Sequence, residues 1–229
     1  MNCGDVTVII VAGGCGSRFG ASMPKQYCDY GGRPLLMTTI DRVRASLPEA
    51  DVSLVLAADW RDEWLRMCDE AGFQSPAIVS GGATRWASVK NAVDALPGDY
   101  SGVIMVHDAA RPLLSRDVAQ RLLDAVRSGA SGAVPVVAMD DSMRELSADG
   151  ASTAVDRSRY VRVQTPQTFD GEKLRQAYSL PYRPEMTDDA SVMEFAGFGA
   201  PALVEGDVRL MKVTRRDDLD ILRFYDRES

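Results

Sequence analysis

Short apolar runs alternate along the chain with segments in which apolar residues recur every three or four positions. The run at 6–11 is too continuous for a strand with one exposed face, so it predicts a buried strand. Further strands are predicted at 52–57, 76–79, 102–106 and 132–137, and helices after Pro34, over 60–71, after Thr84 and after Ser115. This alternation predicts an α/β fold with a doubly wound, mostly parallel sheet, formed as a single domain over residues 1–229.

A polar stretch at 139–163 interrupts this pattern. It alternates weakly with a period of two around an Ala-Asp-Gly turn, which predicts a β-hairpin-like arm outside the main sheet. Beyond the arm, the sequence predicts helices at 171–178 and 187–195, the second capped by Thr187, then strands at 202–206 and 208–214 and a closing helix at 216–225.

Three loops that follow predicted strands, at 12–32, 81–82 and 107–112, point to a binding site. Ligands of such sheets bind beyond the carboxyl ends of the strands, so these loops are expected to converge on one crevice. The first loop is about three times the usual length of such a connection. Its glycines, with Arg18 and Lys25, predict backbone amides and positive charge around a triphosphate.

The first loop does not fit two familiar phosphate-binding patterns. The chain contains no G-x-x-x-x-G-K-[ST] string, which excludes a P-loop. A dinucleotide fingerprint would need a third glycine where Phe19 stands, and Met23-Pro24 breaks the helix that should follow.

Composition narrows the classes of partner. The net charge of −7 and the pI of about 4.8 argue against nucleic acid or an anionic membrane as a partner. One histidine and four cysteines without a CxxC pair argue against a zinc cluster and favour reduced thiols in a cytoplasm. No run is long enough to cross a bilayer, and the N-terminal residues do not resemble a signal peptide.

The loop "AGGCGSRFGASMPKQY" resembles the signature of sugar-phosphate nucleotidyltransferases. Five further motifs, "GGATRWASV", "HDAARP", "VDRSRY…QTPQTF", "TDDAS" and "VEGDVRLMKVT", are similar in collinear order to the 2-C-methyl-D-erythritol 4-phosphate cytidylyltransferase family. The resemblance implies an Mg²⁺-dependent enzyme that joins CTP to a polyol phosphate and releases pyrophosphate.

The resemblance also implies roles for individual residues. Catalytic residues would be Arg18, Lys25, Arg157 and Lys212, and the nucleotide would be bound by Ala12, Gly13, Gly14, Gly16, Gly81, Gly82 and Ser88. Asp108 would hold Mg²⁺, while Arg111 would face the substrate or order the Asp108 loop. His107 is expected to orient its neighbours rather than act as a base, because a phosphate dianion needs no deprotonation.

In the family the polar arm crosses a dimer interface, so the resemblance implies a homodimer with exchanged arms. Ser142 and Thr165 would then bind the acceptor, together with Arg157. One departure stands beside Lys212, where the family commonly has Asn and this chain has Leu210. Two alternatives stay open: a ribitol 5-phosphate cytidylyltransferase, which differs only in acceptor contacts, and a nucleotide-binding regulator without catalysis.

Overall fold

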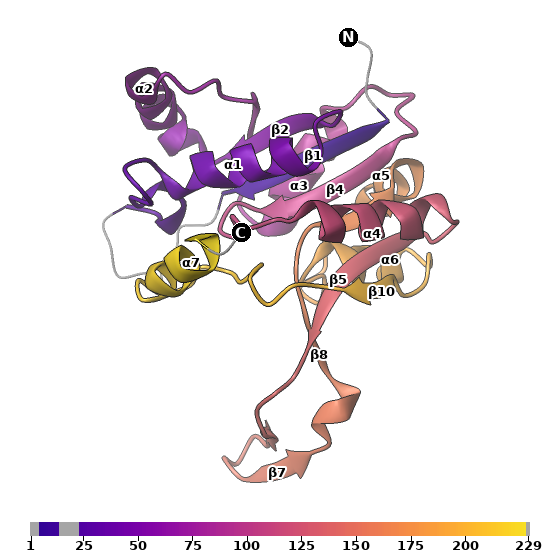
Figure 1. The fold of residues 1–229 in the computed structure, drawn as a ribbon. Helices are drawn as coiled ribbons and strands as arrows, with labels where there is room; N and C mark the ends of the chain where they lie inside the picture. Colours follow the sequence, from indigo (N-terminus) through magenta and orange to yellow (C-terminus); the bar gives the residue numbers. More distant parts are fainter. Residues whose placement is uncertain (1–4, 14–22, 228–229) are drawn as a thin grey trace.

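The computed structural model describes residues 5–13 and 23–227, and Figure 1 shows a sheet covered by helices with an arm projecting from it. Across this described part, one sheet contains β1 (Val6–Ala12), β2 (Asp51–Leu56), β3 (Ala77–Ser80), β4 (Val103–Asp108), β5 (Gly132–Ala138), β8 (Val161–Val163), β9 (Gln167–Asp170) and β10 (Ala202–Glu205). The order is β10-β5-β9-β4-β1-β2-β3, with β8 paired to β5. The α/β, mostly parallel sheet expected from the sequence is confirmed.

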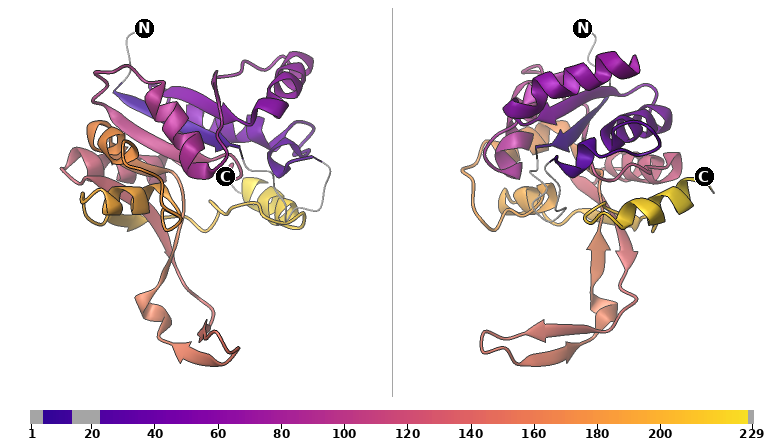
Figure 2. Two further views of the ribbon diagram at one scale, coloured as in Figure 1. Left: turned by 180° about the vertical axis from the view of Figure 1, so that it is seen from behind. Right: turned by 90° about the vertical axis from the view of Figure 1, so that its left-hand side faces the viewer.

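Helices cover both faces of the sheet, as Figure 2 shows. They are α1 (Leu35–Ser46), α2 (Arg61–Ala71), α3 (Arg85–Asp94), α4 (Arg116–Arg127), α5 (Gly171–Tyr178), α6 (Asp189–Phe195) and α7 (Asp218–Arg227). Buried side chains of α1, α2 and α4 share one apolar cluster, and those of α3, α5 and α6 share the other. Two expected N-caps are present, since the Thr84 and Ser115 side chains accept from Ala87 N and Val118 N.

Strand register brings the carboxyl ends of β1, β2 and β4 to one edge. Val11 lies opposite Asp108, and Ala12 lies opposite Leu56. Gly81, which follows β3, donates its N–H to the Leu56 carbonyl at 2.7 Å. The three loops singled out in the sequence therefore leave the sheet together.

One central strand is antiparallel and was not expected from the sequence. β9 lies between β4 and β5 and runs opposite to both. A Cβ on Gly132 would lie 2.4 Å from the Phe169 ring, so the close pairing of β5 with β9 requires glycine there. β9 begins opposite Val106, near the carboxyl end of β4, so Gln164 and Thr165, which precede it, lie at the loop edge.

Residues 139–163 project from the body in Figures 1 and 2. They contain the antiparallel pair β6 (Met143–Leu146) and β7 (Ser152–Val155), the 3₁₀ turn η3 (Arg157–Arg159) and β8, which pairs with the end of β5. Leu146, Tyr160, Val161 and Val163 are exposed large apolar side chains of this arm.

Two local expectations were wrong. Asp188, not Thr187, caps α6, because its carboxylate accepts from Ser191 N while the Ser191 hydroxyl completes a capping box. Residues 208–214 form no strand; side chains from other elements hold this segment instead. Within the described residues, no helix is long and apolar enough to cross a membrane.

Candidate active site

Asp108, at the end of β4, lies among three cationic side chains. Its carboxylate is 2.8 Å from Lys212 Nζ, 3.4 Å from Arg111 Nε and 4.0 Å from Arg85 Nε. Burial raises the pKa of Asp108, but the three cations outweigh burial and hold it well below its usual range. Asp108 therefore stays ionised at neutral pH, within a region of net positive charge.

His107 is fully buried and orients the loop that follows β4. Its Nε2 faces the Arg111 carbonyl at 2.9 Å, so Nε2 carries the proton and Nδ1 accepts from the Thr165 hydroxyl at 3.1 Å. The same hydroxyl accepts from Asp108 N at 3.0 Å. The Thr165 hydroxyl thus links the His107 side chain to the Asp108 backbone, and His107 holds its neighbours as expected.

Lys25 contacts the backbone of the segment that carries Lys212. Lys25, in the 3₁₀ turn η1 (Lys25–Tyr27), donates from Nζ to the carbonyl of Val213 at 2.7 Å, next to Lys212. Leu210, where the family commonly has Asn, is buried in the core, and its carbonyl accepts from Arg111 Nη1 at 3.0 Å. At position 210 the backbone carbonyl makes the polar contact with Arg111, and the apolar side chain packs in the core.

The structure adds Arg85 to the site, which the sequence analysis did not assign. Arg85 Nη2 donates to the buried carboxylate of Asp189 at 2.6 Å, and the Tyr178 hydroxyl donates to the other oxygen at 2.6 Å. The only signal in the sequence was an arginine in one motif and an aspartate in another, 104 residues apart. Asp188 thus caps the N-terminus of α6, and Asp189 forms an ion pair with Arg85.

A narrow turn follows β3 beside the end of β1. The Ser88 hydroxyl accepts from Gly82 N at 3.0 Å and donates to the Thr84 carbonyl at 2.9 Å. A Cβ on Gly13 or on Gly81 would lie 3.3 Å from Ser88 Oγ, so these residues line one confined space. At the base of the first loop, Gln26 Nε2 donates to the carbonyl of Ala12 at 2.7 Å.

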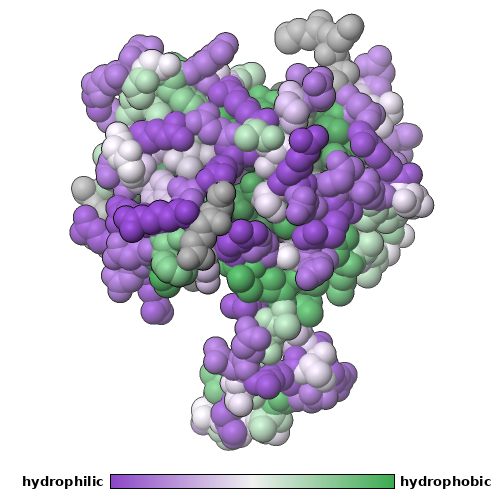
Figure 3. Space-filling model, viewed as in Figure 1, coloured by the Kyte–Doolittle hydropathy of each residue, from purple (hydrophilic) through white to green (hydrophobic). Residues whose placement is uncertain are grey.

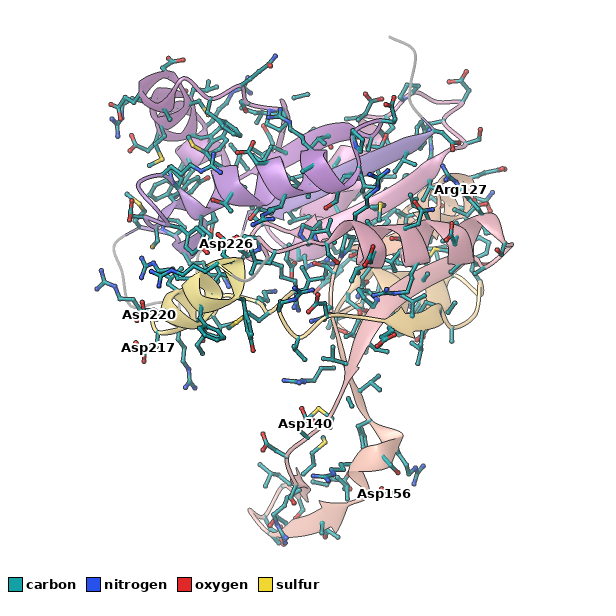
Figure 4. The ribbon with its side chains drawn as sticks, in the orientation of Figure 1. Arg127, Asp140, Asp156, Asp217, Asp220 and Asp226 are labelled. Carbon is teal, nitrogen blue, oxygen red and sulfur yellow. The ribbon has the colours of Figure 1, made fainter. Side chains whose placement is uncertain are left out.

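Five expected site residues remain. Gly14, Gly16 and Arg18 lie outside the described residues. Ser142 and Arg157 are exposed on the arm, where Arg157 donates to the carbonyl of Asp140. Figure 4 shows Asp140 and Asp156 on the arm, away from the body. Their roles stay predictions.

The donor set suits Mg²⁺ only if phosphates supply most ligands. No group of three His, Cys, Asp or Glu side chains within 5–13 and 23–227 could hold a metal ion. Asp108 Oδ1 lies 4.0 Å from Arg85 Nε, beyond hydrogen-bond distance, whereas Oδ2 is paired with Lys212. One carboxylate oxygen beside substrate phosphates is an ordinary Mg²⁺ environment.

The buried imidazole predicts a pH dependence of stability. Burial, as the largest influence, lowers the pKa of His107 to about 4. The unfolded chain binds the proton near pH 6.5 and the folded chain does not, so stability is full above that pH and falls as the pH drops toward 4. We expect the free energy of unfolding, from urea titrations, to decrease by about 2 kcal/mol between pH 7 and pH 5.

The chain has one histidine, so a single variant isolates this effect. His107→Gln should make the stability nearly independent of pH over the same interval. An equal slope in the variant and the original protein would show that other groups cause it.

Comparisons with known proteins show the family of this chain. The family model for 2-C-methyl-D-erythritol 4-phosphate cytidylyltransferase matches residues 6–228. Proteins of that name from Porphyromonas gingivalis and Bacteroides fragilis are 43% identical over 219 residues and 39% identical over 218 residues. These alignments cover 94% of this chain in each case, and 95% and 96% of the relatives.

Solved structures show the same fold. A crystal structure of a 4-diphosphocytidyl-2C-methyl-D-erythritol synthase is 28% identical, with a TM-score of 0.78, and the match covers 96% of each chain. The cytidylyltransferase from Thermus thermophilus is 29% identical, with a TM-score of 0.72, and the match covers 97% of this chain and 98% of that one. This chain therefore belongs to the 2-C-methyl-D-erythritol 4-phosphate cytidylyltransferase family.

Proposed function

We propose that this protein transfers the cytidylyl group of CTP to 2-C-methyl-D-erythritol 4-phosphate and releases pyrophosphate. The observation that carries the proposal is the gathering of Lys212, Arg111 and Arg85 around Asp108 at the loop edge, in a chain of this family. Two anionic reactants repel each other, and fixed cations at their meeting point reduce that repulsion.

The reaction needs positioning and charge neutralisation more than proton transfer. An oxygen of the acceptor phosphate bonds to the α-phosphorus, while the bond to the bridging oxygen breaks and its electron pair leaves with pyrophosphate. We assign Lys25 and Arg18 to the charge that develops on the α-phosphate. We assign Lys212, whose Nζ lies 2.8 Å from the Asp108 carboxylate, to positioning the acceptor phosphate.

The confined turn beside Ser88 suits the nucleotide. Backbone groups of Gly81 and Gly82, held by the Ser88 hydroxyl, form a rigid polar edge that can select cytosine. Ala12 and Gly13 would complete the pocket for the base, and Gly14 and Gly16 would bring backbone amides to the phosphates. Bulkier purine bases should be excluded here, because Gly13 and Gly81 both lie so close to Ser88 that a Cβ on either residue would be 3.3 Å from its Oγ.

Asp108 is the residue we assign to Mg²⁺. When bound, the ion would neutralise phosphate charge. Asp108→Asn should therefore raise the Mg²⁺ concentration for half-maximal rate about tenfold, because an amide oxygen is a weaker ligand than a carboxylate. The measurement is a Mg²⁺ titration at saturating substrates, with the exposed Asp59→Asn as the matched control. An unchanged midpoint would contradict the ligand role.

We further propose a homodimer in which each arm reaches the partner's site. Figure 3 shows apolar surface where the arm meets the body. On β8, on β10 and just after β10, the exposed apolar side chains include Val161, Val163, Leu203 and Val208. A two-stranded arm is marginally stable alone, so docking on a second copy would stabilise it. Arg157 and Ser142 would then bind the acceptor held by the other subunit, and Arg111 and Thr165 would order the shared site.

The reaction itself is tested by a nucleotide screen. The protein is supplied in turn with ATP, CTP, GTP and UTP, each with 2-C-methyl-D-erythritol 4-phosphate and Mg²⁺, and pyrophosphate release is followed. CTP should give the highest kcat/KM, with one pyrophosphate released for each cytidylylated product. Faster release with a purine nucleotide, or none with CTP, would overturn the proposal.

A further inference from the structure

We propose that Gln164 is a positioning residue that fixes the chain segment 206–212, and so fixes the ammonium group of Lys212. The inference rests on the proposed function, in which Lys212 holds the acceptor phosphate. Neither the sequence pattern nor the resemblance gave Gln164 a role. Its contacts within the structure do.

The segment that carries Lys212 lacks the support of a strand. Gln164 replaces that support with three hydrogen bonds. Its Nε2 donates to the carbonyls of Asp207 at 2.7 Å and Leu210 at 3.2 Å, and its Oε1 accepts from Asp207 N at 3.1 Å. The side chain is only 4% exposed, so these bonds are shielded from water.

The fit between Gln164 and the segment is close. A Cβ on Gly206 would lie 2.4 Å from Gln164 Oε1 and 3.0 Å from the Val136 carbonyl. Glycine at 206 therefore allows the backbone to approach the carboxamide. The amide group and the segment fit together as one unit, with little room for the segment to shift.

Gln164 is itself anchored to the sheet beside Asp108. Its N–H donates to the Pro135 carbonyl in β5 at 2.8 Å. The next residue, Thr165, accepts from the backbone N–H of Asp108. Gln164 thus holds the segment that carries Lys212, and Thr165 holds the backbone of Asp108. The side chains of Lys212 and Asp108 form an ion pair with Nζ and Oδ2 2.8 Å apart.

Lysine needs such support more than arginine would. Its ammonium is a point charge on a flexible stem, so its position depends on where the backbone is held. A displacement of about 1 Å in a positioning group can lower the rate of a reaction about 10²-fold. Loss of the Gln164 contacts should therefore weaken use of the acceptor and leave the nucleotide turn at Ser88 untouched.

The test uses Gln164→Glu, which keeps the side-chain size and the Oε1 acceptor. The second carboxylate oxygen would face the carbonyl oxygens of Asp207 and Leu210, so two attractive contacts become repulsive. We expect kcat/KM for the acceptor to fall by about ten- to a hundredfold, with KM for CTP unchanged. Gln74→Glu, at an exposed glutamine, is the matched control and should leave both constants unchanged.

A double-mutant cycle separates positioning from general damage. In a Lys212→Ala background, Gln164→Glu should change kcat/KM by less than about twofold, because the group that it positions is already gone. An equal loss in both backgrounds, or normal acceptor use in Gln164→Glu, would overturn the inference. If Gln164→Glu does not fold, Gly206→Ala disturbs the same contact from the other side and enters the same cycle.

The cycle also distinguishes this inference from the proposed function. An original protein that does not turn over CTP and the acceptor would contradict the proposed function. An active protein in which Lys212→Ala loses acceptor use, but Gln164→Glu does not, would contradict only the inference.

Discussion

Replacing Lys25 with alanine should lower kcat by about 10²-fold or more, while KM for CTP stays within about threefold of its original value. Negative charge builds up on the α-phosphate as the acceptor attacks, and a fixed ammonium group stabilises that state more than the bound substrate. Steady-state kinetics with both substrates varied measures the two constants separately.

A control variant and an alternative outcome test this interpretation. Lys90→Ala removes a half-buried lysine of α3 that pairs with Asp94 on the same helix, and it should leave kcat unchanged. Lys25 also donates to the Val213 carbonyl, next to Lys212. If Lys25 acted only through that contact, its loss would raise KM for the acceptor while kcat at saturation survived, which would contradict direct stabilisation.

Mixing two nearly inactive variants should restore activity if the arms are exchanged. Arg157→Ala removes a residue of the arm, and Lys25→Ala removes one of the body. A dimer of one variant with the other would contain one site with both lesions and one site with neither. With random pairing after co-refolding, roughly a quarter of the original activity should return.

A matched mixture shows whether restoration depends on the arm. Lys25→Ala and Lys212→Ala both lie on the body, where Lys25 bonds the residue next to Lys212. Every site in that mixed dimer should carry a lesion, so mixing should restore nothing. No recovery with Arg157→Ala, or a monomer in light scattering at assay concentration, would contradict arm exchange.

Local signals explain what the sequence predicted well. The continuous apolar runs at 6–11 and 102–106 became β1 and β4, because strands covered on both faces need no polar alternation. Thr84 and Ser115 cap α3 and α4, since a hydroxyl before an apolar helix satisfies a backbone N–H that is otherwise unpaired. The sequence also predicted the loop edge with Asp108, because ligands of such sheets bind beyond the carboxyl ends of the strands.

Long-range contacts explain the features that the sequence did not predict. Four residues at 167–170 form a central strand, which depends on the gap between β4 and β5 rather than on their own pattern. The 208–214 run looks like a strand, yet buried Leu210 and the amide of Gln164 hold it as an irregular segment. The pairing of Arg85 with Asp189 joins two motifs that no local spacing relates.

The hydroxyl of Thr165 fits two different roles. The resemblance implied that its hydroxyl binds the acceptor. In the structure this hydroxyl links Asp108 N to His107 Nδ1, which supports a part in ordering the site. Sequence alone could not separate these roles, because both need the same hydroxyl at the same position.

The most direct measurement of the proposed reaction is a competition between two acceptors. Equal amounts of 2-C-methyl-D-erythritol 4-phosphate and ribitol 5-phosphate are incubated with CTP, Mg²⁺ and the protein, and both cytidylylated products are quantified by ³¹P NMR. The product ratio gives the ratio of the two kcat/KM values without separate rate measurements. The methylerythritol product should predominate by at least about tenfold. A predominance of the ribitol product, or no product from either acceptor, would contradict the function proposed for this chain.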